Sequence, residues 1–494
     1  MSLIELMGYI GIAALLATLV MTYVFKVHKS WLMTFLQNFT GILFLFSGWV
    51  KVVDPLGTAF KMQDYFAEFY ATFAETRFGF LAPVFPFLSS YSGTFAVAMI
   101  IFEIVLGIML IIGYKPRLTA LLFLVLILLF TVLTGFTFLT GYVPMDANFF
   151  DFSAWGEYKA TNMRVTDCGC FGDFIKLEPR TSFYKDIFLL IPGFYFLWRW
   201  KDMHQLVTAR TGLAIVLGSL VLLLGYSVYY TIMDEPQIDF RPFRNGANIA
   251  AIKKTERDAA NAVQVLAMKM KNKTTGEIKQ FAYADYLKNL DKITQEYETI
   301  EQIKTEPAIK ETKISHFDIT DFEGNEKTDV YLANPKAQLM IPVYHAEYTA
   351  IPVNKTVKDS VFIYDTIRIA GKDSMNIVKT FKEVSEKEVV DYNIRWNKEF
   401  LRQFNDVIRP LVEAAANDGV GTGVVISGID QEKADLLAKE TGLKAEFHTA
   451  DEKLLKTIMR SNPGIILWKN GVLLQKWHYK KVPSWSEIKN NLLN

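Results

Sequence analysis

The feature that most constrains this chain is a series of long apolar stretches, all within its first 235 residues. A helix needs about 20 mostly apolar residues to cross a bilayer. The first stretch has no basic residues ahead of it and no small-residue cleavage site, so we interpret it as a retained span. The fifth is the weakest, because it is short and contains Pro192. The sequence predicts about six spans, at residues 4–25, 31–53, 93–113, 118–140, 183–200 and 211–232.

Basic residues are unevenly distributed over the connections between these stretches. The first, third and fifth connections are short and basic, whereas the second and fourth, at about 54–92 and 141–182, are longer and mix acids with bases. Because basic connections stay in the cytoplasm, we expect the N-terminus, the fourth connection and everything after the sixth span to lie outside it. The basic residues in question are Lys26, Lys29, Lys115, Arg117, Arg199, Lys201 and Arg210.

The remainder of the chain is rich in lysine, glutamate and aspartate and should be soluble. Gly276 and Gly324 mark the turns of two predicted hairpins, and a charged helical linker is predicted at 283–310. Buried strands and helices then alternate, which is typical of an α/β domain. They are predicted at 339–345 (strand), 398–418 (helix, kinked at Pro410), 424–429 (strand), 431–441 (helix), 451–461 (helix) and 461–479 (hairpin closing through Lys469-Asn470-Gly471).

These patterns predict three regions: an all-α membrane bundle at 1–235, a hairpin and helical linker at 236–310, and an α/β domain at 311–494. The formal net charge is only +1. A chain without a strong excess of positive charge has no reason to bind nucleic acid, so no such partner is expected.

The chain contains two cysteines, Cys168 and Cys170, both in the fourth connection. Two cysteines cannot form a four-cysteine zinc site, and no metal site is predicted. Residues two apart have Cα atoms roughly 5.5–7 Å apart, near disulfide reach, and Gly169 gives the backbone freedom to close the ring. So small a ring gains only about 1.6 kcal/mol in the chain-entropy model, and strain makes it easier to reduce. A redox pair, a structural disulfide, and a metal or other use of the thiols all stay open.

Charged neighbours should influence these thiols. Asp167 and Asp173 should oppose formation of a thiolate, whereas Arg164 and Lys176 should favour it. The chain has no third cysteine to relay electrons. A redox cycle would therefore need a partner protein, a small thiol or a quinone.

Glu103 lies near the middle of the third stretch, where a carboxylate is costly and should face the bundle interior. It could serve as a proton site or bind a quinone headgroup. Alternatively, it could be a neutral carboxyl group hydrogen-bonded to Asn38, Thr40 or another span.

Lys51, Asp54 and Lys61, around the end of the second stretch, are weaker candidates for binding an anion or a headgroup. The alternative is a snorkelling lysine next to an aspartate that caps a helix. The amphipathic stretch 61–78 is expected to lie on the membrane surface or to cover the outer mouth of the bundle.

The C-terminal motif Asn462-Pro463-Gly464, followed by a strand, an Asn-Gly turn and a strand, resembles the cis-proline end of a thioredoxin fold. The hairpin at 316–330 resembles the start of peroxiredoxin-like and TlpA-like members of that family. The resemblance covers about residues 310–494 and implies an extracytoplasmic thioredoxin-like domain. In that family a redox CxxC motif follows the first buried strand, and here the corresponding segment, YHAEYTAIPVNK, has no cysteine.

The loop TDCGCFGDFIKL (166–177) and the segment SGWVKVVDPLGTAFKMQDYF at the end of the second stretch resemble the DoxX-like family. Within that family they are most similar to the MauE-type proteins of methylamine utilisation. Members with a C-terminal thioredoxin-like domain, common in Bacteroidetes, share the architecture of the whole chain. The resemblance implies a membrane protein linked to quinone or thiol redox chemistry.

We therefore expect a bacterial inner-membrane protein, surrounded by lipid, with its N-terminus and C-terminal domain in the periplasm. Cys168 and Cys170 would exchange disulfides, Glu103 would receive protons or seat a quinone, and the thioredoxin-like domain would dock an envelope protein. The alternative is a non-catalytic membrane scaffold or assembly factor, in which the cysteines only brace the fourth connection.

Overall fold

A computed structural model describes residues 2–165, 169–368 and 375–493. Cys168 and Asp167 lie outside the described residues. The chain forms two compact units. Unit 1 comprises Met1–Phe317, Lys456–Gly464 and Gly471–Val482, and unit 2 comprises Asp318–Leu455, Ile465–Asn470 and Pro483–Asn494.

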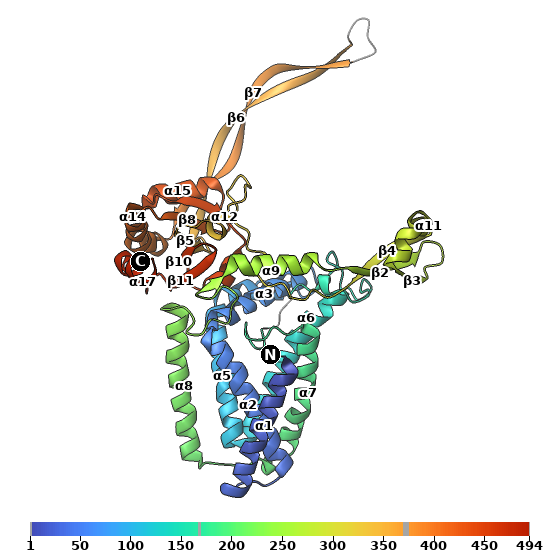
Figure 1. Cartoon of the computed structure of the whole chain (residues 1–494), viewed down its shortest axis with the longest axis vertical. Helices are drawn as coiled ribbons and strands as arrows, with labels where there is room; N and C mark the ends of the chain where they lie inside the picture. Colours follow the sequence, from blue (N-terminus) through green and yellow to red (C-terminus); the bar gives the residue numbers. More distant parts are fainter. Residues whose placement is uncertain (1, 166–168, 369–374, 494) are drawn as a thin grey trace. The chain divides into compact units, whose positions relative to one another are not determined.

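Unit 1 contains a bundle of long apolar helices (Figure 1). Five of the described helices are long and apolar enough to cross a membrane, which confirms a membrane-type helical region in the first half of the chain. The first and fourth of them end in a π-helical turn, η1, and a 3-10 turn, η3. The five spans are Leu3–Val24 (α1, Leu3–Leu19, with η1, Val20–Val24), Trp31–Val53 (α2), Ser92–Ile112 (α5), Pro116–Tyr142 (α6, Pro116–Leu139, with η3, Thr140–Tyr142) and Ala209–Ile232 (α8).

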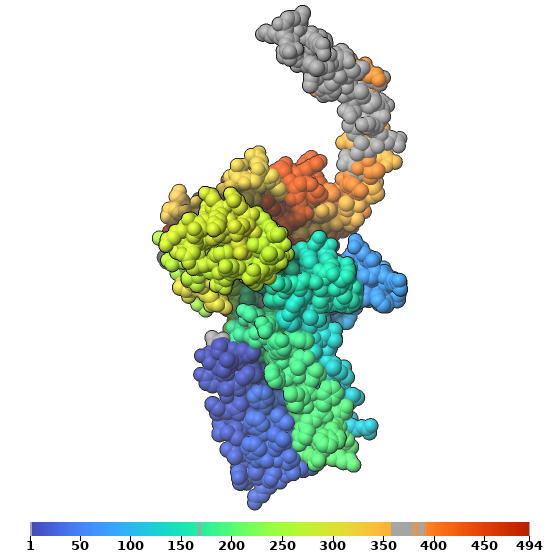
Figure 2. Space-filling view, turned by 90° about the vertical axis from the view of Figure 1, so that its right-hand side faces the viewer, coloured from blue at the N-terminus to red at the C-terminus, as the bar shows by residue number. Residues whose placement is uncertain are grey.

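The helix α7 (Pro179–Trp198) corresponds to the weakest predicted span and is not among these five. Its mean hydropathy is lowered by Lys185 and Asp186. It packs along α6 and lies beside α1, which both views of the bundle show (Figures 1 and 2). Shortly after α7 ends, Trp200 lines the same hollow as Lys115 at the start of α6. The two helices are therefore antiparallel neighbours of similar length.

The helices α2 and α5 approach each other closely, because glycines face each other between them. A Cβ atom on Gly41 would lie 3.1 Å from the carbonyl oxygen of Gly107, and one on Gly107 would lie 2.9 Å from that of Gly41. Small residues allow this close backbone approach in membrane helices. The consequence for the site is that side chains of α2 and α5 meet directly inside the bundle.

The three basic connections lie at the same end of the bundle. Lys29 Nζ, in the first connection, donates to the carbonyl oxygen of Lys201 at 3.0 Å. The backbone N–H of Leu206 donates to Ile112 O at 2.9 Å, which joins the fifth connection to the third. The predicted topology requires the first, third and fifth connections to lie on one side of the membrane. Their position at one end of the bundle agrees with this requirement.

At the other end of α2, the helix α3 (Pro55–Ala74) follows after a single residue, Asp54. This helix contains residues 61–74 of the amphipathic stretch 61–78. α3 packs against α5 and the short helix α4 (Val84–Ser90). Later in the chain, unit 1 also contains α9 (Ile249–Asn261) and the strand β1 (Ala247–Asn248), which pairs antiparallel with β11 (Val472–His478).

A small module in unit 1 consists of the strands β2 (Val265–Asn272), β3 (Ile278–Ala282) and β4 (Tyr297–Lys304) with α10 (Tyr283–Lys288) and α11 (Leu290–Glu296). The hairpin with Gly276 at its turn is confirmed. The prediction of a helical linker over 283–310 is wrong after Glu296. There the chain becomes a strand that pairs with β2, and its β-branched Thr299, Ile300 and Ile303 favour that conformation.

Unit 2 contains an α/β sheet, which confirms the predicted class of the C-terminal half. Its strands follow the order β10-β5-β8-β9, with β5 (Gln338–Val343) fully buried at the centre. β5 and β8 (Gly421–Ile426) are parallel, as are β8 and β9 (Glu446–Thr449), whereas β10 (Gly464–Lys469) is antiparallel to β5. The helices are α12 (Asp329–Leu332), α13 (Lys398–Gln403), α14 (Arg409–Asn417), α15 (Gln431–Thr441), α17 (Trp485–Leu492) and the first part of α16 (Glu452–Ile458), whose last three residues belong to unit 1.

Several details of this region differ from the sequence prediction. The predicted hairpin at 316–330 is only a tight turn, with an isolated bridge between Thr320 and Glu326 and φ of 90° at Gly324. The strand β9 was not predicted, because its four residues are too few for a clear alternation. The helix predicted over 398–418 is confirmed, and its interruption is a π-helical turn, η6 (Phe404–Ile408), which separates α13 from α14 and precedes Pro410.

A long two-stranded hairpin follows β5, formed by β6 (Tyr348–Arg368) and β7 (Met375–Trp396) (Figure 1). Its register pairs Tyr348 with Trp396 and continues to Arg368 opposite Met375. The hairpin occupies the segment directly after the first buried strand, and this segment contains no cysteine.

Candidate functional site

The described part of the CGC loop begins at Gly169, with Cys170 half-buried next to it. Gly169 and Gly172 have φ of 64° and 52°, in the left-handed region that side chains rarely adopt. This confirms the backbone freedom expected at Gly169. Phe171 is buried and forms a bridge with Ile175, so the loop after the cysteine is a compact turn.

The helix α2 fixes the backbone of Cys170 through a buried polar chain. Ser47 Oγ donates to the carbonyl oxygen of Cys170 at 2.8 Å, and Lys51 Nζ donates to Ser47 Oγ at 3.2 Å. Lys51 Nζ also lies 2.7 Å from Glu103 Oε2 of α5. Only 7% of the Lys51 side chain and 2% of that of Glu103 are exposed, so this ion pair lies inside the bundle.

The structure brings together two of the predicted site residues, Glu103 and Lys51. Glu103 faces the bundle interior, as expected for a carboxylate in an apolar helix. Its partner is Lys51, however, and not Asn38 or Thr40, whose side chains bond to Thr18 Oγ1 and Leu36 O. The interpretation of Lys51 as a snorkelling lysine is wrong, because its ammonium group points to Glu103.

A second buried ion pair, which the sequence analysis missed, lies in α7. Lys185 Nζ pairs with Asp186 Oδ1, and Thr134 Oγ1 of α6 donates to Asp186 Oδ2 at 3.0 Å. The Asp186 side chain is fully buried. The available signal was the presence of two charges within an otherwise apolar stretch.

Electrostatics at Cys170 depend on both ion pairs. Burial raises the pKa of the Cys170 thiol, the Lys185 ammonium opposes the rise, and the Asp186 carboxylate adds to it, with Lys51 also opposing. Arg164 and Lys176, the cations expected to act here, pair with acids of their own, Glu68 at 3.8 Å and Asp173 at 3.5 Å. The strongest cations near the thiol are therefore Lys185 and Lys51.

Lys61 lies beside the CGC loop. A Cβ atom added to Gly169 would lie 3.3 Å from Lys61 Cγ, so the stem of the lysine packs against this glycine. The ammonium group lies 3.8 Å from Asp64, one turn further along α3. The candidate residue Lys61 thus contacts the loop from the side of α3.

Asp54 caps α3, as predicted, by accepting a hydrogen bond from Gly57 N at 3.1 Å. It also binds Arg460: Arg460 Nε lies 2.9 Å from Asp54 Oδ1, and Arg460 Nη2 lies 2.6 Å from Asp54 Oδ2. Burial raises the pKa of Asp54, but the Arg460 guanidinium outweighs it and holds the pKa below its ordinary value. Arg460 Nη2 also lies 3.5 Å from Asp173 of the CGC loop.

Further charges continue this network within unit 1. Glu235 Oε1 accepts from the backbone N–H groups of Arg460 and Ser461 at 3.0 and 2.8 Å, and Glu235 Oε2 accepts from Arg241 at 2.9 Å. Arg241 and Lys476 both bind Asp239. Burial beside Arg241 lowers the pKa of Lys476 to about 8. The C-terminal segments of unit 1 are therefore tied to the end of α2 through alternating charges.

Part of this site lies in a segment of the chain that matches a known protein family. Residues 29–144 match the family model of methylamine utilisation protein MauE. The matched range includes Lys51, Asp54, Lys61 and Glu103 and ends before the CGC loop. No curated protein and no solved structure matches the chain. The chain therefore contains a MauE-type membrane domain, which covers residues 29–144.

Proposed function

We propose that this MauE-type membrane protein exchanges disulfides between its CGC loop and a dithiol on a protein of the cell envelope. The observation that supports this most strongly is the polar chain from Glu103 through Lys51 and Ser47 to the Cys170 carbonyl. Charged groups inside an apolar bundle are costly and are usually functional. Here two such ion pairs influence one thiol.

The exchange consists of two substitutions at sulfur. A thiolate of the partner attacks one sulfur of the Cys168–Cys170 disulfide, forms a mixed disulfide and releases the other cysteine as a thiolate. The second thiolate of the partner then attacks the mixed disulfide. The partner leaves as a disulfide, and both cysteines are left reduced with two electrons and two protons gained. The raised pKa of Cys170 keeps its thiol protonated at neutral pH.

The membrane topology is part of this proposal. Antiparallel packing of α7 with α6 supports α7 as a sixth span, since its charges Lys185 and Asp186 are paired inside the bundle. Six spans would put the CGC loop and the C-terminal half on the same, periplasmic side, away from the basic connections.

The C-terminal half is proposed to be a thioredoxin-like docking domain. The strand order β10-β5-β8-β9 and the cis peptide bond between Asn462 and Pro463, immediately before the antiparallel strand β10, support this fold. The long hairpin β6–β7 replaces the segment that would hold a CxxC motif. This domain would bind the partner protein while the CGC loop reacts.

A quinone is not included in the proposed reaction. Glu103 is a predicted contact for a quinone headgroup, but its carboxylate binds Lys51 at 2.7 Å. A headgroup at this position would have to displace a buried ion pair, which is costly.

A second candidate function is a non-catalytic scaffold for an envelope complex. The observation that favours it is the absence of cysteine from unit 2, together with a protruding two-stranded hairpin that could bind a partner. In that case the CGC loop would only brace the outer end of the bundle.

The test is a single-turnover reaction of the full chain in lipid nanodiscs. The oxidised protein is mixed with a dithiol peptide, and mass-shifting maleimide counts the thiols on both molecules. We expect one equivalent of oxidised peptide with the natural chain and none with Cys168→Ser or Cys170→Ser. Equal peptide oxidation by the natural chain and the serine variants would refute exchange. No oxidation by any of them would favour the scaffold.

A further inference from the structure

Arg460 connects three parts of unit 1 that are far apart in the sequence. Its guanidinium group binds Asp54 at the end of α2 and lies 3.5 Å from Asp173 in the CGC loop. Its backbone N–H donates to Glu235, which follows α8. Only 4% of the Arg460 side chain is exposed. A single residue of the segment Lys456–Gly464 therefore touches both the CGC loop and the helix that supports that loop.

The geometry of the Arg460–Asp54 contact is that of a strong interaction. Two guanidinium nitrogens face two carboxylate oxygens, at 2.9 and 2.6 Å, which is the bidentate arrangement. Both groups are largely removed from water, so breaking the pair would leave an uncompensated buried charge. The contact is therefore expected to persist in the resting protein.

The same segment also packs on α3. Lys456 Nζ donates to Gln63 Oε1 at 3.1 Å and lies 4.8 Å from the centre of the Phe60 ring, and Arg460 lies 5.3 Å from the same ring. A cation next to an aromatic face adds a favourable interaction. Arg460 is thus held in place by an acid, by a ring and by its own backbone.

The CGC loop is consequently held from two sides. On the side of α2, Ser47 binds the Cys170 carbonyl, and on the side of Lys456–Gly464, Arg460 lies next to Asp173. Between these two contacts lies Gly172, whose φ of 52° marks a tight turn. Loss of the Arg460 contact would release one end of this turn and expose the half-buried Cys170 thiol.

We propose that Arg460 is a positioning residue that restrains the part of the CGC loop from Gly169 to Asp173, so that seating of the segment Lys456–Gly464 sets the reactivity of Cys170. This inference rests on the proposed function and states how the disulfide exchange would be regulated. Because the segment directly precedes β10, a partner that binds the C-terminal half and shifts this segment would release the loop. Exchange would then be linked to partner binding.

The test compares Arg460→Gln, Arg460→Lys and the control Arg402→Gln, an exposed arginine with 72% of its side chain accessible, in the full chain in nanodiscs. The alkylation rate of reduced Cys170 and the reduction potential of the cysteine pair are measured. We expect Arg460→Gln to speed alkylation about tenfold and to shift the potential. Arg460→Lys should keep only part of the restraint on the loop, because lysine cannot bind Asp54 in a bidentate manner.

Unchanged alkylation and potential in a folded Arg460→Gln protein would overturn this inference, as would equal changes in the Arg402 control. Asp173→Asn is a second variant that should change the alkylation rate in the same direction without removing the Asp54 contact. A faster alkylation in Arg460→Gln combined with no peptide oxidation by the natural chain would support the restraint and reject the proposed exchange. Failure of the Arg460 restraint and failure of the proposed exchange therefore give different results.

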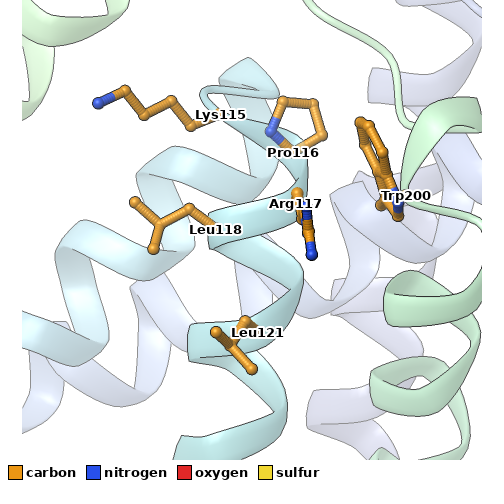
Figure 3. A pocket seen from close by; sticks show the side chains of 6 residues that line it. All are labelled: Lys115, Pro116, Arg117, Leu118, Leu121 and Trp200. Carbon is orange, nitrogen blue, oxygen red and sulfur yellow. The ribbon is translucent and has the colours of Figure 1, made fainter.

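A separate observation concerns the other end of α6, where a hollow of about 560 Å³ is lined by both charged and apolar side chains (Figure 3). Arg117 points along α6 on the side of Trp200, whereas Lys115 points away from Trp200. Within residues 2–165, 169–368 and 375–493, neither cation forms an ion pair. The lining residues are Lys115, Pro116, Arg117, Leu118, Leu121 and Trp200.

The apolar part of this hollow lies on the outer face of a predicted span. Leu118 and Leu121 are exposed there, one turn apart on α6. Lys201, the residue after Trp200, adds a further positive charge at this end. Unpaired cations above exposed leucines, beside a tryptophan, are complementary to an anionic headgroup with an acyl chain.

We infer that this hollow binds an anionic phospholipid, with its phosphate near Arg117 on the side of Trp200, Lys115 adding positive charge at the same helix end, and one acyl chain along Leu118 and Leu121. The inference is independent of the redox proposal. The occupant is a lipid and not a free phosphate, because the leucines below the cations would face hydrocarbon in a membrane.

The test measures binding of spin-labelled phosphatidylglycerol to the full chain in phosphatidylcholine nanodiscs. The double variant Lys115→Gln with Arg117→Gln is compared with a control double variant, Lys159→Gln with Arg180→Gln. The control removes two exposed cations at the opposite end of α6 and α7. We expect about tenfold weaker lipid binding in the Lys115/Arg117 variant and unchanged lipid binding in the Lys159/Arg180 control. Equal losses in both variants, or no loss in either, would overturn the site.

Discussion

At the scale of single residues, the buried pair Lys51–Glu103 is the most informative feature of the site. A carboxylate in the middle of an apolar span could be predicted to face the interior and to need a partner. The identity of that partner could not be predicted, because Lys51 is near the end of a different helix, 52 positions away. Only the close approach of α2 and α5 brings the two charges together.

Replacement of one member of this pair should be far more damaging than replacement of both. Lys51→Met or Glu103→Leu alone leaves a buried charge and should cost about 3–5 kcal/mol of the free energy of unfolding. The double variant should be close to neutral. Unfolding in detergent, followed by intrinsic fluorescence, measures this. Single variants that lose less than about 0.5 kcal/mol would show that the pair is solvated.

The pH dependence of Cys170 reactivity follows from its surroundings. Burial raises the pKa of the thiol above the ordinary value of 9.0, so less thiolate is present at any given pH. In a Cys168→Ser background, the alkylation rate should still be rising at pH 9 and should reach half of its maximum only above that value. After denaturation the same midpoint should fall back to the ordinary value. A midpoint below 9 in the folded protein would contradict the described environment.

At the scale of elements, the long apolar helices could be predicted closely. The spans Trp31–Val53 and Ala209–Ile232 lie within two residues of their predicted limits, because length and hydropathy alone define them. The helix Gln431–Thr441 agrees with its prediction, with Asp430 as its cap and Gly442 after its end.

Other elements could not be predicted, because tertiary pairing decides them. The strand Tyr297–Lys304 contains residues that also suit a helix, and it becomes a strand only by pairing with Val265–Asn272. The hairpin Tyr348–Trp396 could not be predicted, because each of its strands exceeds 20 residues, whereas strands usually have about 3–10 residues.

The proposed sixth span leads to a test of topology. In a background without native cysteines, single cysteines replace Arg180, in the first turn of α7, and Arg210, in the first turn of α8. If α7 crosses the membrane, an impermeant maleimide should label position 180 from one side of sealed vesicles and position 210 from the other. A cysteine at Lys26 should behave like that at Arg210. Labelling of positions 180 and 210 from the same side would contradict a spanning α7.

At the scale of the whole chain, the candidate site is assembled from parts that sequence analysis treats separately. Every predicted site residue that the structure describes lies in unit 1, near the CGC loop or the helices that support it. Arg460 reaches Asp54 across 406 positions of the chain. No local pattern signals such a contact, since an isolated arginine after a short helix has no distinctive periodicity. The residues of the site could be predicted from the sequence, but the contacts between them could not.

The measurement that tests the central claim most directly is the reduction potential of the Cys168–Cys170 pair in the full chain. Alkylation in graded thiol buffers, read as a mass shift, gives this value. An exchanging pair should have a potential near or above about −200 mV, in the range of proteins that donate or isomerise disulfides. A potential below about −300 mV, typical of structural disulfides, would contradict the account and leave the scaffold as the better explanation.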